Sequence, residues 1–314
     1  MLKRNIFYRF TIIGFMIILG DITSVAQQVS DEEFSFPISV PMYERGKGPL
    51  ILFDEAHNNA STLKGAYSAF GRLLQQDGYN IVSARENVSL DLLKKGNIFV
   101  TVNAMYDVEN WNLPAKSAFS QEEINALSTW VSSGGSLFLV TDHMPCGASV
   151  HDLAGRFGIN VINGFALRGD GLPEVFSKQR NTLFSNVITS PHGNEIDSIM
   201  CWGGTGFIVP PDAHVISVLG SDYNIYLPND VSLIKSPLAP NLPYISGRGL
   251  VNGAYLKFGK GKIVIFGDGA PFSAQLQGIK SNKRGMNHPW ARQNAQLLLN
   301  IVHWLDGRIS NDVD

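Results

Sequence analysis

The sequence has few cysteines, no concentration of positive charge and, after its first residues, no long apolar run. Its only cysteines are Cys146 and Cys201, which are too few in a chain of 314 residues to form a disulfide framework. Nothing in their spacing demands a bridge, so we expect two unpaired thiols. Because 25 Lys and Arg are offset by 27 Asp and Glu, there is no basic patch of the kind that binds nucleic acid or anionic lipid.

The one apolar run near the N-terminus is typical of a signal peptide. Three basic residues precede an apolar stretch from Phe10 to Leu19, and small residues then lead to Ser24-Val25-Ala26. The stretch is too short to span a bilayer comfortably, and no later run is long enough. We therefore expect residues 1–26 to be removed, and a soluble mature chain, secreted or periplasmic, to begin at Gln27 without a membrane span.

Two catalytic motifs are also absent. No G-x-G-x-x-G follows the first predicted strand, which argues against a dinucleotide-binding fold. No G-x-S-x-G elbow occurs, which argues against an ordinary serine hydrolase. The composition, 44% hydrophobic and 17% charged, is that of a globular protein with ample core.

Apolar strands alternate with amphipathic helices through the first half of the chain. Ser120-Gln121-Glu122-Glu123 has the S-x-x-E form of a capping box at the start of one helix. Strand, helix and strand repeated in this way predict an α/β fold: a doubly wound, mainly parallel sheet with helices on both faces and the first strand at its centre. The predicted strands are residues 49–54, 79–84, 97–103 and 136–141, and the predicted helices are residues 61–77, 91–95, 121–133 and 148–157.

The pattern weakens after residue 160. Residues 164–250 are predicted to be an irregular, β-rich insertion in a single domain that covers residues 49–307. Gly259-Lys260-Gly261 then separates two apolar runs as in a hairpin, and a last helix should open at His288-Pro289. An extended arm at 27–48 and a short tail at 308–314 complete the predicted organisation.

Four stretches carry a resemblance to a known superfamily. The chain resembles the class I glutamine amidotransferase-like superfamily, and within it the branches that lack the amidotransferase nucleophile, such as ThuA-like proteins and the GIFT domains of intraflagellar transport. This resemblance implies a flavodoxin-like or amidotransferase-like fold and is poor as a guide to activity. The stretches are FSQEEINALSTWVSSGGSLFLVTDH at 119–143, SVHDLAGRFGINV at 149–161, GKGKIVIFGDGAPFS at 259–273 and NAQLLLNIVHWLDG at 294–307.

One departure from the superfamily pattern bears on activity. Amidotransferases place a cysteine directly after the strand that here ends at Thr141. This chain has Asp142-His143-Met144-Pro145 there, and Cys146 comes too late for that turn. We therefore do not expect a glutamine amidotransferase.

Polar residues gather where the apolar strands end. In an open parallel sheet, ligands bind beyond the carboxyl ends of the strands, so these side chains are expected to share one rim. Carboxylates with imidazoles suit a polar ligand, an acid and base pair or a divalent cation. The candidate ligand-binding residues are Asp54, Glu55, His57, Asn58, Asn103, Asp142, His143, Asp268 and His288, and the candidate metal ligands are Asp54, His57, Asp142 and His143.

Each of these residues also has a structural interpretation. Asp and Asn after a strand often bond to the backbone of the next turn. For Asp54 and His57 we favour a site shared with Asp142 and His143, which requires the Asp54 carboxylate to lie within about 6 Å, roughly two hydrogen-bond lengths, of one of them. Trp111, Trp202 and Trp290 either line a sugar-binding cleft or pack in the core and its rim.

Two functions remain open. The first is an exported binding or accessory protein that recognises a small polar ligand, such as a saccharide, or a protein partner. The alternative is a hydrolase that uses Asp54, Asp142, His143 and His57, with or without a divalent metal. No cofactor is predicted, and fold resemblance alone assigns no reaction.

Overall fold

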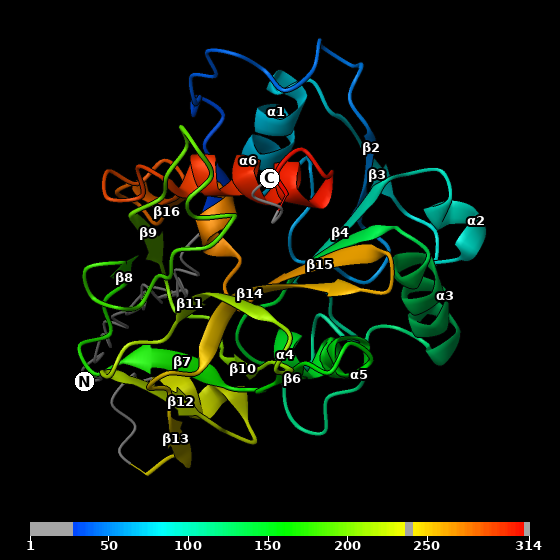
Figure 1. Ribbon diagram of the computed structural model, residues 1–314. Helices are drawn as coiled ribbons and strands as arrows, with labels where there is room; N and C mark the ends of the chain where they lie inside the picture. The colour runs from blue at the N-terminus through cyan, green and yellow to red at the C-terminus, as the bar shows by residue number, and fades with distance from the viewer. Residues whose placement is uncertain (1–27, 236–240, 311–314) are drawn as a thin grey trace, which may run out of the picture.

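A mixed β-sheet organises the protein. The computed structural model describes residues 28–235 and 241–310, and in these residues nine strands form this sheet (Figure 1). Its parallel core has the order β3-β2-β4-β5-β15, and β14, β10 and β6 extend it antiparallel, with β11 also paired to β14. The strands are β2 (Leu50–Asp54), β3 (Asn80–Ala84), β4 (Ile98–Val102), β5 (Ser136–Val140), β6 (Asn160–Val161), β10 (Phe207–Ile208), β11 (His214–Val218), β14 (Val251–Phe258) and β15 (Gly261–Phe266).

The first core strand is flanked on both sides, as expected, but it lies next to the edge strand β3 and not at the centre of the sheet. Strand β2 pairs in parallel with β3 on one side and with β4 on the other. The chain therefore adds β3 on one side of β2 and later strands on the opposite side, so the connections diverge at the carboxyl end of β2. The sheet is thus an α/β structure with a parallel core, as expected, although β14, β10, β6 and β11 make almost half of it antiparallel.

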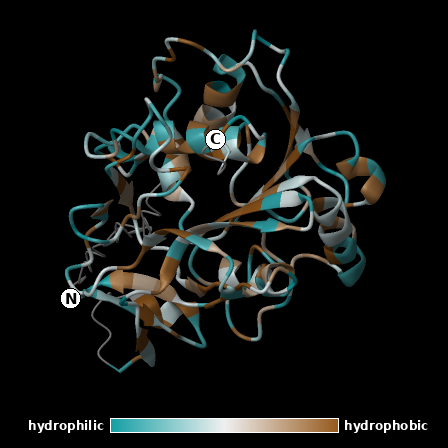
Figure 2. Cartoon of the chain, viewed as in Figure 1, coloured by the Kyte–Doolittle hydropathy of each residue, from teal (hydrophilic) through white to brown (hydrophobic). Residues whose placement is uncertain are grey.

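Helices cover both faces of the parallel core because successive side chains of a buried strand point to opposite faces. Alternate residues such as Phe53 pack with α1 and α6, whereas Leu52 and its equivalents pack with α2, α3 and α5. Figure 2 shows the central strands in the brown of apolar residues. The helices are α1 (Ser68–Gln76), α2 (Leu90–Leu93), α3 (Gln121–Ser132), α4 (Cys146–Ser149), α5 (His151–Gly155) and α6 (Asn294–Leu305), with 3₁₀ turns η1 (Val231–Lys235) and η2 (Ala270–Phe272).

Helix boundaries are where the predictions fail most often. The predicted capping box of α3 is present, with Ser120 and Glu123 each satisfying the other's backbone N–H. However, α1 begins at Ser68 because residues 62–67 form turns, and the region 148–157 contains two short helices instead of one. The last helix begins at Asn294, so His288-Pro289 belongs to a preceding turn and not to its first turn.

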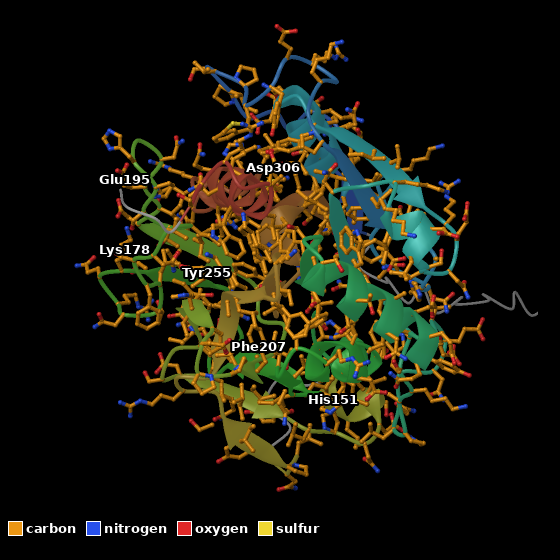
Figure 3. All side chains as sticks on the ribbon, turned by 45° about the vertical axis from the view of Figure 1, so that its right-hand side comes forward. His151, Lys178, Glu195, Phe207, Tyr255 and Asp306 are labelled. Atoms are coloured by element: carbon orange, nitrogen blue, oxygen red, sulfur yellow. The ribbon has the colours of Figure 1, made fainter. Side chains whose placement is uncertain are left out.

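The region predicted to be irregular contains more regular structure than expected. It forms a three-stranded sheet and a two-stranded sheet, and a third small sheet joins residues 28–30 to a hairpin after η2. In Figure 3 the labelled side chains of Phe207 and Tyr255 lie within the molecule, whereas those of Lys178 and Glu195 lie at its edge. The additional strands are β7 (Phe165–Arg168), β12 (Tyr223–Tyr226) and β13 (Tyr244–Ser246), then β8 (Glu174–Ser177) and β9 (Ser198–Cys201), then β1 (Gln28–Ser30), β16 (Ala274–Gln277) and β17 (Asn282–Gly285).

Two sequence predictions concern membranes and export. In residues 28–235 and 241–310, no helix combines the length and the apolar character needed to cross a bilayer. The predicted signal peptide, residues 1–26, lies outside the described residues, as does most of the predicted tail at 308–314. Export therefore stays a prediction from the sequence.

Candidate functional site

The structure separates the predicted site residues into distinct groups. Asp54 and His57 belong to a buried triad, which we define as Asp54, His57 and Glu123. His57 Nδ1 lies 2.8 Å from Asp54 Oδ1, and His57 Nε2 lies 3.0 Å from Glu123 Oε1. All three residues are buried, and the His57 ring stacks on Phe119 with centroids 4.0 Å apart. An imidazole held between two carboxylates in this way is expected to carry two protons and a positive charge.

The carboxylates of the triad also accept hydrogen bonds from residues around it. Asp54 Oδ2 accepts a hydrogen bond from Thr101 Oγ1 at 2.7 Å and one from Asn59 Nδ2 at 3.2 Å, and Asp54 Oδ1 also accepts the N–H of Ala56 at 3.1 Å. Glu123 accepts the N–H groups of Ser120 and Val88, each at 2.9 Å. In the described part of the chain, no hydrogen bond joins Asp54 to Asp142 or His143, and the site shared by these residues stays a prediction.

The charges of the triad support one another. Burial alone disfavours the charged form of His57, but hydrogen bonding and charge from Asp54, and then from Glu123, outweigh it and raise the pKa of His57. Burial likewise disfavours ionised Glu123, yet its backbone N–H partners at Ser120 and Val88, followed by His57, lower the pKa of Glu123. The charged forms of His57 and Glu123 are therefore both favoured, and the hydrogen bonds of the triad are saturated, as expected of a structural element that joins β2, α3 and the loop before α2.

A second group forms a cavity at the ends of β4, β5 and β15, which we call the strand-end pocket. Its volume is about 290 Å³. Three of the nine predicted residues line it, namely Asn103, Asp142 and His143, and Trp111 stands with them. The full lining is Gln28, Ala60, Ser61, Ala66, Tyr67, Asn103, Met105, Trp111, Asp142, His143, Cys146, Gly269, Ala270, Gln275 and Arg284.

Asn103 has an unusual backbone and an unsatisfied side chain. Its φ of 49° lies in the left-handed region, where Asn is among the few residues tolerated besides Gly. Its Oδ1 is buried and has no hydrogen-bond partner in the described residues. A Cβ at Gly269 would lie 3.1 Å from Asn103 Nδ2 and 3.3 Å from Tyr67 Oη, so the glycine leaves room for both polar groups beside it. A buried amide oxygen left unpaired costs free energy and indicates a ligand or water beside it.

His143 is held by rings and by a backbone carbonyl. It stacks on Phe165 with centroids 4.7 Å apart, and Trp111 lies at 6.0 Å. Its Nδ1 is 2.7 Å from Met144 O, so Nδ1 carries the proton in the neutral ring and Nε2 is an acceptor. His143 therefore offers the pocket a fixed aromatic edge and one nitrogen of known role.

Asp268 lies below the pocket and does not line it within the described residues. It is fully buried and accepts the N–H groups of Trp202 and Ala270. Burial, and then the charge of Asp142, raise the pKa of Asp268 to about 6. Asp142 accepts the N–H of His143 at 2.8 Å and that of Gly269 at 3.3 Å. The carboxylates of Asp142 and Asp268 are thus neighbours, and of the two only Asp142 lines the cavity in the described residues.

Both cysteines are buried free thiols. Cys146 reaches the pocket at the start of α4, but burial, followed by the charge of Asp142, raises the pKa of Cys146 far above its ordinary value. Because the thiolate is the nucleophilic form, this cysteine is suited to packing and not to attack on a carbonyl.

Three predicted residues have structural partners elsewhere. Glu55 accepts the N–H of Leu63 and pairs with Arg85, and Asn58 donates to Tyr106 O. His288 belongs to an aromatic cluster with Trp202 and Trp290, each with its ring centroid 5.7 Å from that of His288, and burial lowers the pKa of His288. Of the three tryptophans, Trp111 lines the pocket, whereas Trp202 and Trp290 belong to this cluster.

The described residues contain no cluster of side chains that would support the predicted metal site. Among residues 28–235 and 241–310, no group of three or more His, Cys, Asp or Glu is arranged to hold an ion. The four candidate ligands are divided, with Asp54 and His57 in the triad and Asp142 and His143 in the pocket.

Several pocket and triad residues were not selected from the sequence. The sequence pattern indicates Glu123 only as a capping residue, and Tyr67 only as one position within the predicted helix at 61–77. Gln275 and Arg284 belong to the hairpin β16–β17, which the polar, Gly-bounded sequence at 274–285 did not reveal. Register pairs these two residues directly across that hairpin, and both line the pocket.

The comparisons with known proteins show similarity of fold. The structure is similar to the mmIFT52 N-terminal domain, with a TM-score of 0.56 and 15% identity over 82% of this chain and 96% of that one. ThuA-like proteins from Bacteroides uniformis ATCC 8492 and Parabacteroides merdae ATCC 43184 give TM-scores of 0.44 at 13% and 10% identity, covering 86% and 85% of this chain and 94% and 93% of theirs. No family model and no curated protein matches the sequence. At these identities the first similarity concerns the fold alone, and the two weaker ones add no functional information.

Proposed function

We propose that the chain is an exported binding protein whose strand-end pocket takes a small polar ligand, about the size of one sugar ring. The observation that carries the proposal is the unpaired Oδ1 of Asn103, held by a left-handed backbone beside a cavity that Asp142 and Trp111 also line. Small-molecule sites combine an apolar or aromatic wall with a few convergent polar groups, and this pocket has both.

Size and position support a small ligand. A volume of about 290 Å³ is at the low end for ligand pockets and admits a monosaccharide more readily than an oligosaccharide. The pocket lies beyond the carboxyl ends of β4, β5 and β15, where open α/β sheets bind ligands. Trp111 offers a flat apolar face, and Asp142 offers a carboxylate that accepts hydroxyl groups.

A second proposal concerns the superfamily to which the fold belongs. We propose an amidotransferase-like domain of the ThuA-like or GIFT-type branch, without the elbow nucleophile and doubly wound in the flavodoxin-like sense. The order β3-β2-β4-β5 and the sequence Thr141-Asp142-His143 at the end of β5 support it. The inert, buried thiol of Cys146 supports the absence of glutaminase chemistry.

The hydrolase alternative keeps one favourable observation. Asp142 and Asp268 are neighbouring carboxylates, and a pKa of about 6 for Asp268 is near that of a general acid. Against it, Asp268 is fully buried, and Asp54 and His57 belong to the separate buried triad. Release of a chromophore from nitrophenyl glycosides or esters, abolished by Asp142→Asn, would favour the hydrolase over the binding protein.

Calorimetric titration with neutral monosaccharides tests the binding function. We expect at least one, from a panel that includes glucose and galactose, to bind the mature chain, and Asp142→Asn to weaken that binding about tenfold, the loss of one charge-assisted hydrogen bond. Asp152→Asn removes an equal charge from the exposed face of α5 and is the matched control. Equal loss in both variants would contradict a role for Asp142.

Export has its own test, because its support is the sequence alone. Mass spectrometry of the native protein should find Gln27 at the N-terminus. An intact segment 1–26 on the native protein would contradict cleavage at the predicted site.

A further inference from the structure

Arg284 is the charged residue of the pocket that the binding function leaves unexplained. It lies on β17 at the pocket wall and is half-buried. Its Nη1 is 3.5 Å from Gln277 Oε1, which is longer than an ordinary N–H···O hydrogen bond and therefore a weak contact. In the described residues it has no carboxylate within ion-pair distance, whereas Arg72, Arg85 and Arg180 each pair with a glutamate.

The position of this guanidinium is set by the hairpin. Arg284 pairs with Gln275 across β16 and β17, so both side chains project from the same face of the hairpin into the pocket. Gln275 Nε2 donates to Ser273 Oγ at 2.8 Å, which fixes the neighbouring amide. The charge of Arg284 reaches the buried Asp268 as a favourable field, but that carboxylate is already bonded to two backbone N–H groups. The planar donors of Arg284 are therefore available to a group that enters the pocket.

We propose that the ligand of the strand-end pocket is an acidic monosaccharide of the uronate type, whose carboxylate is bound by Arg284. A guanidinium presents donors in a planar fork that matches the two oxygens of a carboxylate. Asp142 and Asn103 then face hydroxyl groups of the same ring, and Trp111 faces its apolar side. The inference rests on the proposed function, because it names the ligand class of that same site.

Arg and Asp on one pocket also explain why a hydroxylated acid is preferred to a simple one. Arg284 is the only Lys or Arg lining the cavity in the described residues, and Asp142 is the only Asp or Glu. A ligand with a carboxylate alone would satisfy Arg284 but would bring no hydroxyl donor to Asp142. A neutral sugar would satisfy Asp142 but leave Arg284 unpaired. A uronate satisfies both.

Paired ligands provide the test, because glucuronate and glucose differ chiefly in the carboxylate on the same ring. Calorimetric titration of the mature chain in low salt should give glucuronate about tenfold tighter binding than glucose, with the difference shrinking as salt is added. Propionate supplies a carboxylate without the ring and should bind more weakly than glucuronate.

Two variants on the same strand separate recognition from general charge. Arg284→Gln should abolish the roughly tenfold preference for glucuronate over glucose. Lys283→Gln removes the same charge from the exposed neighbouring position and should keep the preference. Near-ultraviolet circular dichroism identical to that of the parent chain would show that each variant is folded.

The outcomes distinguish the two proposals. Equal affinity for glucose and glucuronate, or a preference that survives Arg284→Gln, would overturn the uronate inference and leave the binding function standing. Propionate binding as tightly as glucuronate would also overturn the uronate inference, because the site would then recognise a carboxylate without the sugar ring. Failure of glucose, galactose and glucuronate alike to bind would overturn both proposals.

Discussion

The buried triad and the strand-end pocket are two polar groups at neighbouring strand ends, and they differ in how completely they are satisfied. In the triad, the carboxylates of Asp54 and Glu123 hold His57 from both sides and take backbone or hydroxyl donors on their remaining positions. In the pocket, Asn103 Oδ1 is unpaired and Arg284 lacks an ion-pair partner in the described residues. Polar residues after a strand are therefore informative about binding only when their hydrogen bonds remain incomplete.

The comparison also explains why similar residues serve different ends. Asp54 and Asp142 both follow an apolar strand, but the turn after Asp54 folds back so that His57 and Asn59 reach its carboxylate. After Asp142 the chain leads to Met144 and Pro145, and in the described residues the Asp142 carboxylate accepts only two backbone N–H groups, from the adjacent His143 and from Gly269 after β15, beside the open cavity. The polar residues from Asp54 to Asn59 thus form a hydrogen-bonded corner after β2, and the groups left without partners in the described residues lie at the ends of later strands.

The largest expected effect is on stability, from removing a charge in the triad. Asp54→Asn leaves the buried His57 with one carboxylate and an amide, and we expect the free energy of unfolding to fall by about 3 kcal/mol, as for breaking a buried ion pair. Urea denaturation followed by circular dichroism measures this. Asp142→Asn is the matched pocket variant and should cost less than about 1 kcal/mol. Equal losses in the two variants would erase the distinction between triad and pocket.

The second expected effect is a dependence of stability on pH. The pKa of His57 is raised in the folded protein, so its contribution is fully present below the unfolded value of 6.5 and is lost as pH rises through the folded value. Above that point a single N–H remains for two carboxylates. Denaturation midpoints should therefore fall over this range in the parent chain, and His57→Gln should remove most of that slope. If the denaturation midpoint of His57→Gln depends on pH as strongly as that of the parent chain, a group other than His57 causes the dependence.

A smaller effect is expected where the triad joins the capping box. Ser120 caps α3 and accepts the N–H of Glu123, whose carboxylate also binds His57. Ser120→Ala should lower the free energy of unfolding by about 1 kcal/mol, the usual cost of losing an N-cap. Ser89→Ala removes the cap of the four-residue α2 and provides a comparison outside the triad. A loss several times larger at Ser120 would show that the cap also orients Glu123.

The smallest effect on stability is expected at Asn103. Asn103→Gly removes a buried oxygen that has no partner in the described residues, and it places at this left-handed position the residue that adopts positive φ with least strain. The free energy of unfolding should therefore stay within about 1 kcal/mol of the parent value. Ligand affinity measured by calorimetry should nevertheless fall. A strongly destabilised Asn103→Gly would mean that this amide is structural, like the triad.

The sequence predicted the sheet better than the site, for identifiable reasons. Apolar runs such as Asn97–Asn103 and the capping box at Ser120 depend on local pattern, and both were read correctly. In the hairpin β16–β17, the alternation of β16 (AQLQ) lasts only four residues and β17 (NKRG) has no apolar side chain, so periodicity did not reveal the hairpin. The sequence therefore did not predict that Arg284 lines the pocket. The triad was missed in part because Glu123 is 66 residues from His57, and only the folded sheet brings them together.

The order of the strands has a consequence for synthesis and truncation. Strand β15 pairs with β5 on one side and β14 on the other, so it joins the parallel and antiparallel halves of the sheet. Until residues 261–266 leave the ribosome, the far edge of β5 has no partner, and an unpaired apolar strand edge is a template for aggregation. Any fragment ending before β15 should therefore be insoluble, whatever length of parallel core it contains. Folding of this chain is completed from its C-terminal side.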